Sequence, residues 1–143
     1  MRKFIGAGAI AALSLALLAS TASASFDPHF SVIAKQTSGH QGQSSFRFKD
    51  RLFNPANLHD RVGRDWGRCK FRHHVRKIRC RALAHLNGDI GGFGDIRVRG
   101  TLGHHDNRLN VVGGTHDFRG VAGKVTVHTI HGNTDRLHFA LVR

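Results

Sequence analysis

From residue 29 onward, apolar and polar side chains alternate with a period of two, which is the spacing of a β-strand and not of a helix. Residues 45–53 show the pattern clearly, because Phe46, Phe48 and Leu52 alternate there with a run of cations. Eight segments carry it: residues 29–35, 45–53, 62–71, 77–86, 93–102, 108–112, 123–130 and 135–143. Short turns rich in glycine or asparagine separate these segments. We therefore predict an all-β fold, an antiparallel barrel or sandwich of eight strands.

Two cysteines lie in the middle of the chain, and a hairpin that turns at residues 73–76 would place them opposite each other. In that register Cys69 faces Cys80 and Phe71 faces Ile78, so one side of the ribbon carries only apolar and sulfur groups. We therefore predict a cross-strand disulfide between Cys69 and Cys80. It would close a small loop, stabilise the fold by at most about 3 kcal/mol and fix the register of the hairpin.

The opposite side of the same hairpin is strongly cationic. Its predicted cross-strand pairs join like charges, namely Arg68 with Arg81, Lys70 with Arg79, and Arg72 with Lys77. Like charges repel across a ribbon, so this side weakens the hairpin that the disulfide would hold together. Two interpretations stay open. This side is either a solvated outer wall, or a platform for extracellular polysaccharide, teichoic-type polymer, anionic lipid or nucleic acid.

The first 24 residues differ from the rest of the chain. Arg2 and Lys3 precede an apolar run of small residues, and residues 22–24 offer the small-x-small pattern that signal peptidase cleaves. The run is too short for a comfortable membrane span. We therefore expect residues 1–24 to be a signal peptide and residues 25–143 to form one secreted domain with no membrane span. A disulfide suits that compartment.

Charge narrows the range of partners. The chain has 22 Lys and Arg residues against 9 acidic residues, and its formal net charge is +13. Every acidic residue is an aspartate. Because the expected leader carries only Arg2 and Lys3, the exported domain stays strongly basic, and its charge favours anionic partners.

Two aspartates fall on predicted interior faces. Asp50 shares its face with phenylalanines, and Asp65 shares its face with Cys69. A buried carboxyl group needs a partner or acquires a raised pKa. Two such groups beside aromatic walls suit an acid and a base for cyclisation or isomerisation, so we predict Asp50 and Asp65 as catalytic residues. The structural alternative is that each satisfies backbone groups or an inward Arg61 or Arg64.

Twelve histidines raise the question of a metal site. The candidate clusters lie at predicted turns and have no third ligand beside them. They are His73 with His74, His104 with His105, and His128 with His131. Adjacent residues of a strand point to opposite faces, and no H-E-x-x-H segment is present. We therefore predict no metal site and no cofactor. A phosphate-binding loop is disfavoured as well, because Gly123 and Lys124 are followed by Val125 and by no predicted helix.

The segment at residues 111–127, VVGGTHDFRGVAGKVTV, resembles the GGTG-x-F-x-G-A-x-G segment of the allene oxide cyclase and dirigent-like barrels. Its turn motif consists of Gly113, Gly114, Thr115, His116, Gly120 and Gly123. The segments FRFKDRLF, RVGRDWGRC and DRLHFALVR are similar in order and spacing to those of secreted bacterial members, so the resemblance covers residues 45–143. Two positions depart from the pattern. His116 replaces a glycine, although His is among the better tolerated residues in a left-handed backbone, and Val121 replaces the usual alanine.

The resemblance implies a single eight-stranded antiparallel β-barrel with an apolar lumen. Plant relatives use that lumen to cyclise an unstable epoxide or to steer radical coupling, without a metal or organic cofactor, and they assemble as trimers. A homotrimer is therefore one expectation for this chain. Taken from its residues alone, the glycine segment is a strand, a tight turn and a return strand.

Our leading interpretation is a secreted barrel that binds a small apolar ligand in its lumen, as a cofactor-independent cyclase or isomerase or as a protein that guides coupling. Its catalytic residues would be Asp50 and Asp65. Its lumen wall would comprise Phe46, Phe48, Phe71 and Phe139. The alternative is a cationic extracellular protein that is no enzyme and binds acidic polymers or anionic surfaces. Its binding residues would be Arg68, Lys70, Arg72, Lys77, Arg79 and Arg81.

Overall fold

The alternating segments form eight strands in the computed structural model, which describes residues 26–72, 75–103 and 107–143. The strands are β1 (His29–Gln41), β2 (Ser45–Asn54), β3 (Asn57–Arg72), β4 (Val75–Asn87), β5 (Phe93–Gly103), β6 (Arg108–Gly114), β7 (Ala122–His131) and β8 (Thr134–Val142). A short 3-10 helix, η1 (His116–Phe118), lies between β6 and β7. The expected signal peptide and the histidine pairs at 73–74 and 104–105 fall outside the described residues. Within those residues, no helix has the length and apolar character needed to cross a membrane.

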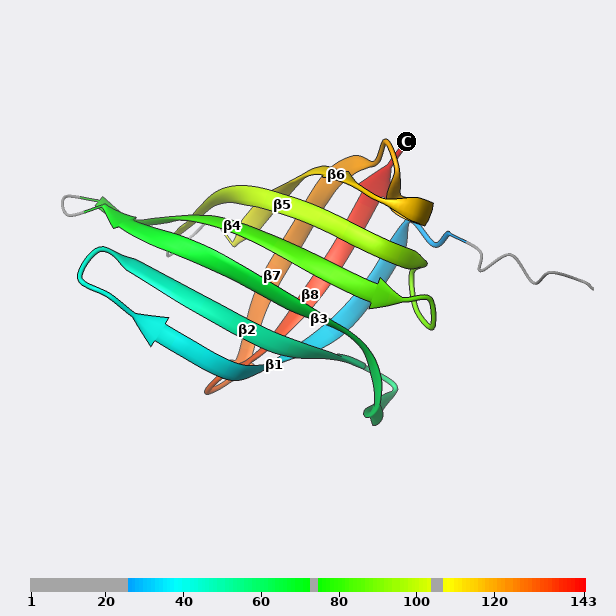
Figure 1. Ribbon diagram of the computed structural model, residues 1–143, viewed down its shortest axis with the longest axis horizontal. Helices are drawn as coiled ribbons and strands as arrows, with labels where there is room; N and C mark the ends of the chain where they lie inside the picture. Colours follow the sequence, from blue (N-terminus) through cyan, green and yellow to red (C-terminus); the bar gives the residue numbers. More distant parts are fainter. Residues whose placement is uncertain (1–25, 73–74, 104–106) are drawn as a thin grey trace, which may run out of the picture.

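The strands close into a barrel in chain order, each antiparallel to the next. β1 completes the ring by pairing with β8, from His29 opposite Ala140 to Lys35 opposite Thr134. In Figure 1, β2 to β5 run side by side across the front of the barrel, and β7 and β8 pass behind them. Closure satisfies the backbone groups that an open sheet leaves at its edges. The predicted single eight-stranded antiparallel β-barrel is confirmed.

The hairpin of β3 and β4 has the predicted register at its centre, where a disulfide joins Cys69 and Cys80. The predicted cross-strand disulfide is therefore confirmed. Near the turn the register shifts, and Arg72 lies opposite Val75. The predicted pairing of Arg72 with Lys77 is wrong, because a bulge after Phe71 displaces the last residue of β3 along its partner.

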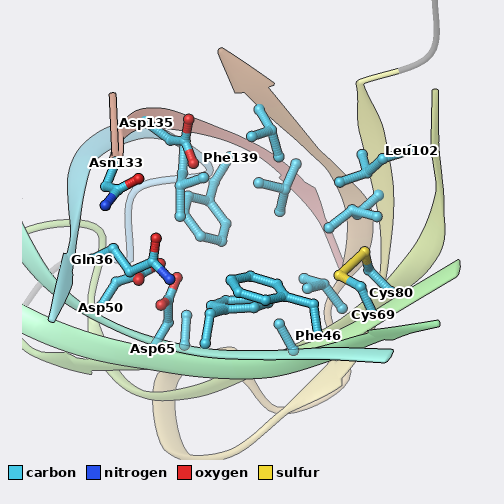
Figure 2. A pocket seen from close by; sticks show the side chains of 18 residues that line it. Gln36, Phe46, Asp50, Asp65, Cys69, Cys80, Leu102, Asn133, Asp135 and Phe139 are labelled. Atoms are coloured by element: carbon cyan, nitrogen blue, oxygen red, sulfur yellow. A yellow bond between two sulfur atoms is a disulfide. The ribbon is translucent and has the colours of Figure 1, made fainter. Parts of the chain in front are cut away.

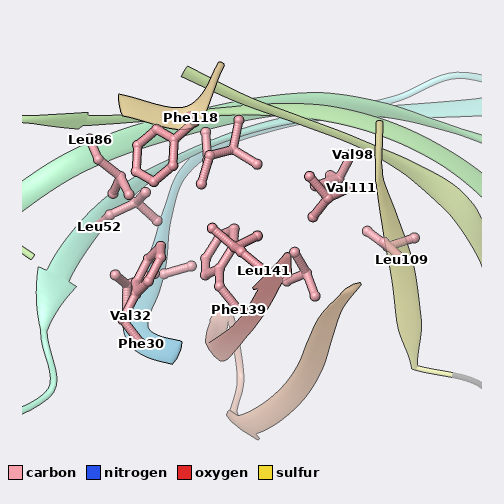
Figure 3. Close-up of a cluster of buried hydrophobic side chains, with 14 of the residues drawn as sticks. Phe30, Val32, Leu52, Leu86, Val98, Leu109, Val111, Phe118, Phe139 and Leu141 are labelled. Atoms are coloured by element: carbon pink, nitrogen blue, oxygen red, sulfur yellow. The ribbon is translucent and has the colours of Figure 1, made fainter. Parts of the chain in front are cut away.

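Near η1 the barrel interior is filled by apolar side chains, which belong to the cluster of buried residues drawn in part in Figure 3. Phe118 of η1 is fully buried there, and its ring lies 6.1 Å from the ring of Phe26 and 6.4 Å from that of Phe30. Phe30 in turn stacks on Phe139, with 4.6 Å between the ring centroids. Fully buried aliphatic side chains fill the remaining space, namely Val32, Leu52, Val62, Leu86, Ile96 and Leu141. This end of the barrel interior is therefore occupied by buried side chains.

The glycine segment at residues 111–127 is not the tight turn predicted from sequence. β6 ends at Gly114, and η1 folds back over the barrel end before β7 begins. A Cβ atom at Gly114 would lie 2.5 Å from the carbonyl oxygen of Asp95 and 2.6 Å from Cβ of Phe118, so only glycine fits there. His116 adopts the left-handed conformation, with φ of 50°. The segment therefore serves to insert Phe118 into the core, which a two-residue turn could not do.

Candidate functional site in the barrel lumen

The other half of the barrel interior contains a cavity of about 200 Å³ (Figure 2). Most of its wall is apolar and includes Phe46, Phe48, Ala82, Ala84, Val98, Leu102, Leu109, Val125, Val127, Leu137, Phe139 and the disulfide. One side is polar and consists of Gln36, Asp50, Asp65, Asn133 and Asp135. The exposed Asn133 belongs to the turn between β7 and β8, so the cavity reaches the end of the barrel opposite η1.

Strand alternation and barrel closure bring the polar groups together. Gln36 on β1 lies opposite Asp50 on β2, and Asp50 lies opposite Asp65 on β3. Directly opposed residues have Cβ atoms only about 5 Å apart, so these three side chains form one inward row. Asp135 joins them from β8, which pairs with β1 one step further round the barrel.

The carboxyl groups of Asp50 and Asp65 are joined by a hydrogen bond. Burial raises the pKa of Asp65 to about 9, and the charge of Asp50, the hydrogen bond to it and the charge of Asp135 act in the same direction. Burial also raises the pKa of Asp50, although the hydrogen bond from Asp65 lowers it. Two carboxyl groups this close share one proton, and the deeper burial of Asp65 favours protonation there. The lumen thus presents a pair of carboxyl groups with a shared proton.

Each of these two carboxyl groups keeps one oxygen for another partner. The Oδ1 atoms of Asp50 and Asp65 are buried and accept no hydrogen bond from any described residue. Buried oxygens without a partner are costly, because they lose their hydration and receive nothing in exchange. The arrangement is therefore complementary to a ligand that carries an O–H or N–H group.

An aromatic shelf borders the carboxyl pair. The rings of Phe46 and Phe48 on β2 stack with 6.0 Å between their centroids. Gly67 lies opposite Phe48 on β3, and a Cβ atom there would come within 2.6 Å of the Phe48 ring. The absence of a side chain at residue 67 therefore leaves room for the Phe48 ring.

The structure brings together most of the residues predicted for the lumen. Asp50, Asp65, Phe46, Phe48 and Phe139 all line the cavity. Their catalytic and ligand-binding roles stay predictions.

Phe71 was expected in the same wall, but the structure does not bring it to the cavity. It is half-buried beyond the disulfide, next to the bulge near the end of β3. Alternation assigned its face correctly relative to Ile78, but it could not show that the cavity ends before this position.

Three polar residues that line the cavity were not predicted from the sequence, namely Gln36, Asn133 and Asp135. Counting back by twos from Phe139 on β8 reaches Asp135, and the same count from Phe30 on β1 reaches Gln36. Both signals were present in the sequence. Asn133 lies in a turn, where alternation gives no information.

The cationic residues of the hairpin lie on the outer surface. Arg68, Lys70, Lys77, Arg79 and Arg81 are exposed, and the side chain of Arg72 is not among those the structure describes. Four of them border a surface depression together with Arg99 of β5. Among the described residues, no group of three or more His, Cys, Asp or Glu side chains is arranged to hold a metal ion.

Comparisons with known proteins bear on the fold. No family model and no curated protein sequence matches the chain. A solved pyocyanin demethylase superposes with a TM-score of 0.63 at 21% identity, over 80% of this chain and 99% of that one. Two pterocarpan synthase dirigent proteins, PsPTS1 and GePTS1, each superpose with a TM-score of 0.58 over 79% of this chain, at 11% and 10% identity and over 91% and 81% of their own chains. The chain therefore has the barrel fold of the dirigent and allene oxide cyclase-like proteins, as the resemblance in its sequence indicated.

Proposed function

We propose that the protein binds a small, largely apolar molecule in its lumen and catalyses a cofactor-independent isomerisation or cyclisation by proton transfer. The observation that supports this is the shared-proton pair of Asp50 and Asp65 in the wall of an otherwise apolar cavity. Apolar clefts with a few convergent polar groups and shifted pKa values are the usual form of small-molecule sites.

The dimensions of the cavity restrict the ligand. About 200 Å³ lies below the range of roughly 300–1,000 Å³ typical of drug-sized ligands, so a compact molecule of one or two rings is expected. The shelf of Phe46 and Phe48 suits a flat apolar ring. The unpartnered Oδ1 atoms suit a hydroxyl or amine at the edge of that ring.

The two carboxyl groups would have different roles. Asp50, as the carboxylate, would remove a proton from a carbon or oxygen atom of the ligand, and Asp65 would deliver its proton to another atom. The ligand then gains and loses one proton, so that bonds rearrange without any change of oxidation state. Asp135 would keep Asp65 protonated through its negative charge. The named activities of the fold neighbours, a demethylase and two pterocarpan synthases, show that those barrels act on small molecules.

The binding half of the proposal is tested with a matched pair of ligands, 2-naphthol and naphthalene, by calorimetry. We expect 2-naphthol to bind at least about tenfold more tightly than naphthalene. Its hydroxyl can donate a hydrogen bond to a charged or buried group, and a bond of this kind contributes about that much to affinity. Asp50→Asn should remove that preference, while Arg136→Gln on the exposed face of β8 should retain it. Equal affinity for the two ligands in the unaltered protein would exclude recognition by the carboxyl pair.

The catalytic half is tested with 2-tetralone, a bicyclic ketone with an acidic C–H group. General base catalysis by Asp50 would accelerate exchange of that hydrogen in heavy water, which NMR measures directly. We expect Asp50→Asn to lower the rate by 10²-fold or more while the protein stays folded. Catalysed exchange that survives in both Asp50→Asn and Asp65→Asn would disprove this role.

We further propose that the domain is exported after removal of residues 1–24 and that it forms a trimer. The basic start and the small-x-small motif support export, and the resemblance to plant relatives supports the trimer. N-terminal sequencing of protein from the culture medium should begin at Ser25. Sedimentation analysis of the same material measures the oligomeric state, and a monomer would contradict the second part.

A further inference from the structure

Four arginines from four consecutive strands lie in one row across the outside of the barrel. Arg47 on β2 is opposite Arg68 on β3, Arg68 is opposite Arg81 on β4, and Arg81 is opposite Arg99 on β5. All four side chains are exposed. Neighbouring strands are about 4.8 Å apart, so the row extends over roughly 14 Å, perpendicular to the strands. Sequence alternation could not reveal it, because the register of four strands creates it.

A second set of cations runs beside this row. Lys70 lies opposite Arg79, two residues along the strands from Arg68 and Arg81. The one ion pair found among the described residues joins His85 and Asp95, so none of the four row arginines is neutralised by a carboxylate there. Directly opposed like charges destabilise a sheet. A bound polyanion would remove that repulsion.

The depression beside the row offers a ligand mainly positively charged side chains. A depression of about 600 Å³ is bordered by Arg68, Lys70, Arg79, Arg81 and Arg99 together with the neutral Thr101. No aromatic side chain borders it. Trp66 is exposed but does not border the depression, and the Arg64 guanidinium lies 5.5 Å from its ring centroid. Single-stranded nucleic acids bind through bases stacked on aromatic rings, and this depression offers none.

We propose that this row binds a linear polymer whose charged backbone is itself phosphate, lying across β2 to β5. Guanidinium groups bind phosphate oxygens through paired hydrogen bonds, which an ammonium group cannot match. A row of arginines at strand spacing offers such a fork about every 4.8 Å along the polymer. This site is separate from the lumen. It adds Arg47 and Arg99 to the cationic residues that were predicted from the sequence.

The test uses linear polyphosphate chains and measures binding through the fluorescence of Trp66, the one tryptophan in the chain. We compare Arg81→Gln with Arg99→Gln combined in one variant against a control variant that combines Arg119→Gln with Arg136→Gln. Both variants lose two exposed cations, but only the first loses them from the row. We expect the row variant to bind at least tenfold more weakly. The slope of log affinity against log salt concentration should fall by about 0.7 for each lost contact.

Three results would overturn the proposal. An equal loss in both variants would show that net charge alone attracts the polymer. Unchanged binding in both would place the site elsewhere. Tighter binding of heparin or polygalacturonate than of polyphosphate at equal charge concentration would show that the phosphate backbone is not what the row selects. Binding of 2-naphthol should be unchanged in the row variant, so failure here is distinct from failure of the lumen proposal.

Discussion

The two halves of the barrel interior follow the same strand alternation but have opposite contents. Along β4, Leu86 lies in the packed half and is fully buried, whereas Ala84 and Ala82 line the cavity. Along β2 the fully buried Leu52 gives way to Asp50. A protein gains stability by filling its core and loses stability by burying carboxyl groups. The half with the cavity is therefore less stable than a fully packed core would be, which is common at functional sites.

The packed half is filled in part by a large side chain from outside the sheet. Phe118 enters from η1, which is positioned by backbone bonds from Thr115 to Asp95 and from Phe118 to Thr115. The hydroxyl of Thr115 also accepts a hydrogen bond from the backbone N–H of Asp95. At the opposite end of the barrel, no side chain comparable to Phe118 enters the interior from a connection between strands, as far as the described residues show.

The largest expected effect comes from the same substitution made in each half. Phe118→Ala should lower the free energy of unfolding by about 3–5 kcal/mol, because it leaves a void in a close-packed region. Phe48→Ala should cost only about 1 kcal/mol, because that half-buried ring already borders empty space. Urea unfolding of both variants measures the difference. Equal losses would mean that the cavity is filled and packed in solution.

The second largest effect on the free energy of unfolding should come from removing the disulfide, which lines the cavity. Replacing Cys69 and Cys80 together with alanine should reduce the free energy of unfolding by about 2–3 kcal/mol, since the bond closes a loop with a sequence separation of 11 residues. The opposed cations on the outer side of the hairpin would then repel with no cross-link to restrain them. Urea unfolding should show this loss at low salt and a smaller loss at high salt. A loss independent of salt would exclude that repulsion as a factor.

The buried acid gives the hollow half a distinctive pH dependence. Because the pKa of Asp65 is raised to about 9, the folded protein binds a proton that the unfolded chain releases near pH 4. Stability should therefore fall as pH rises from about 4 to about 9, by at most about 1.4 kcal/mol per pH unit from this group. Asp65→Asn should flatten the profile and stabilise the protein at pH 8 by about 2 kcal/mol.

The control for this profile is Asp89→Asn, which alters an exposed aspartate outside the cavity. Urea unfolding of this variant at several pH values should reproduce the slope of the unaltered protein. If Asp65→Asn keeps the same slope as that control, Asp65 is ionised in the folded state, and the assignment of the shared proton is wrong.

The smallest effect on stability is expected at His116, in the segment that positions Phe118 in the core. His116 has a left-handed backbone, which costs a β-branched residue about 1–2 kcal/mol. His116→Val should therefore destabilise the protein by about that amount, while His116→Gly should stay within about 1 kcal/mol of the unaltered protein. Thermal unfolding of the pair measures the contrast. Greater harm from glycine than from valine would show that backbone strain at residue 116 does not control the stability of this segment.

Local alternation in the sequence was enough to decide which way most strand residues point. It placed Asp50, Phe46 and Phe48 inside, and the count across the hairpin set Cys69 opposite Cys80. These predictions succeeded because side-chain direction in a strand depends only on the parity of the position. The same rule explains the misplaced Arg72 pairing, since a bulge changes the parity locally.

Only the tertiary structure decided which of these side chains meet. Asp135 and Gln36 reach the carboxyl pair because β8 closes onto β1, a contact between the two ends of the sheet. Phe118 fills one end of the barrel interior because η1 folds over that end. The arginine row exists because four strands align in one register. Sequence alternation fixes direction within a strand, whereas register, bulges and closure fix neighbours between strands, and the cavity and the row both depend on neighbours.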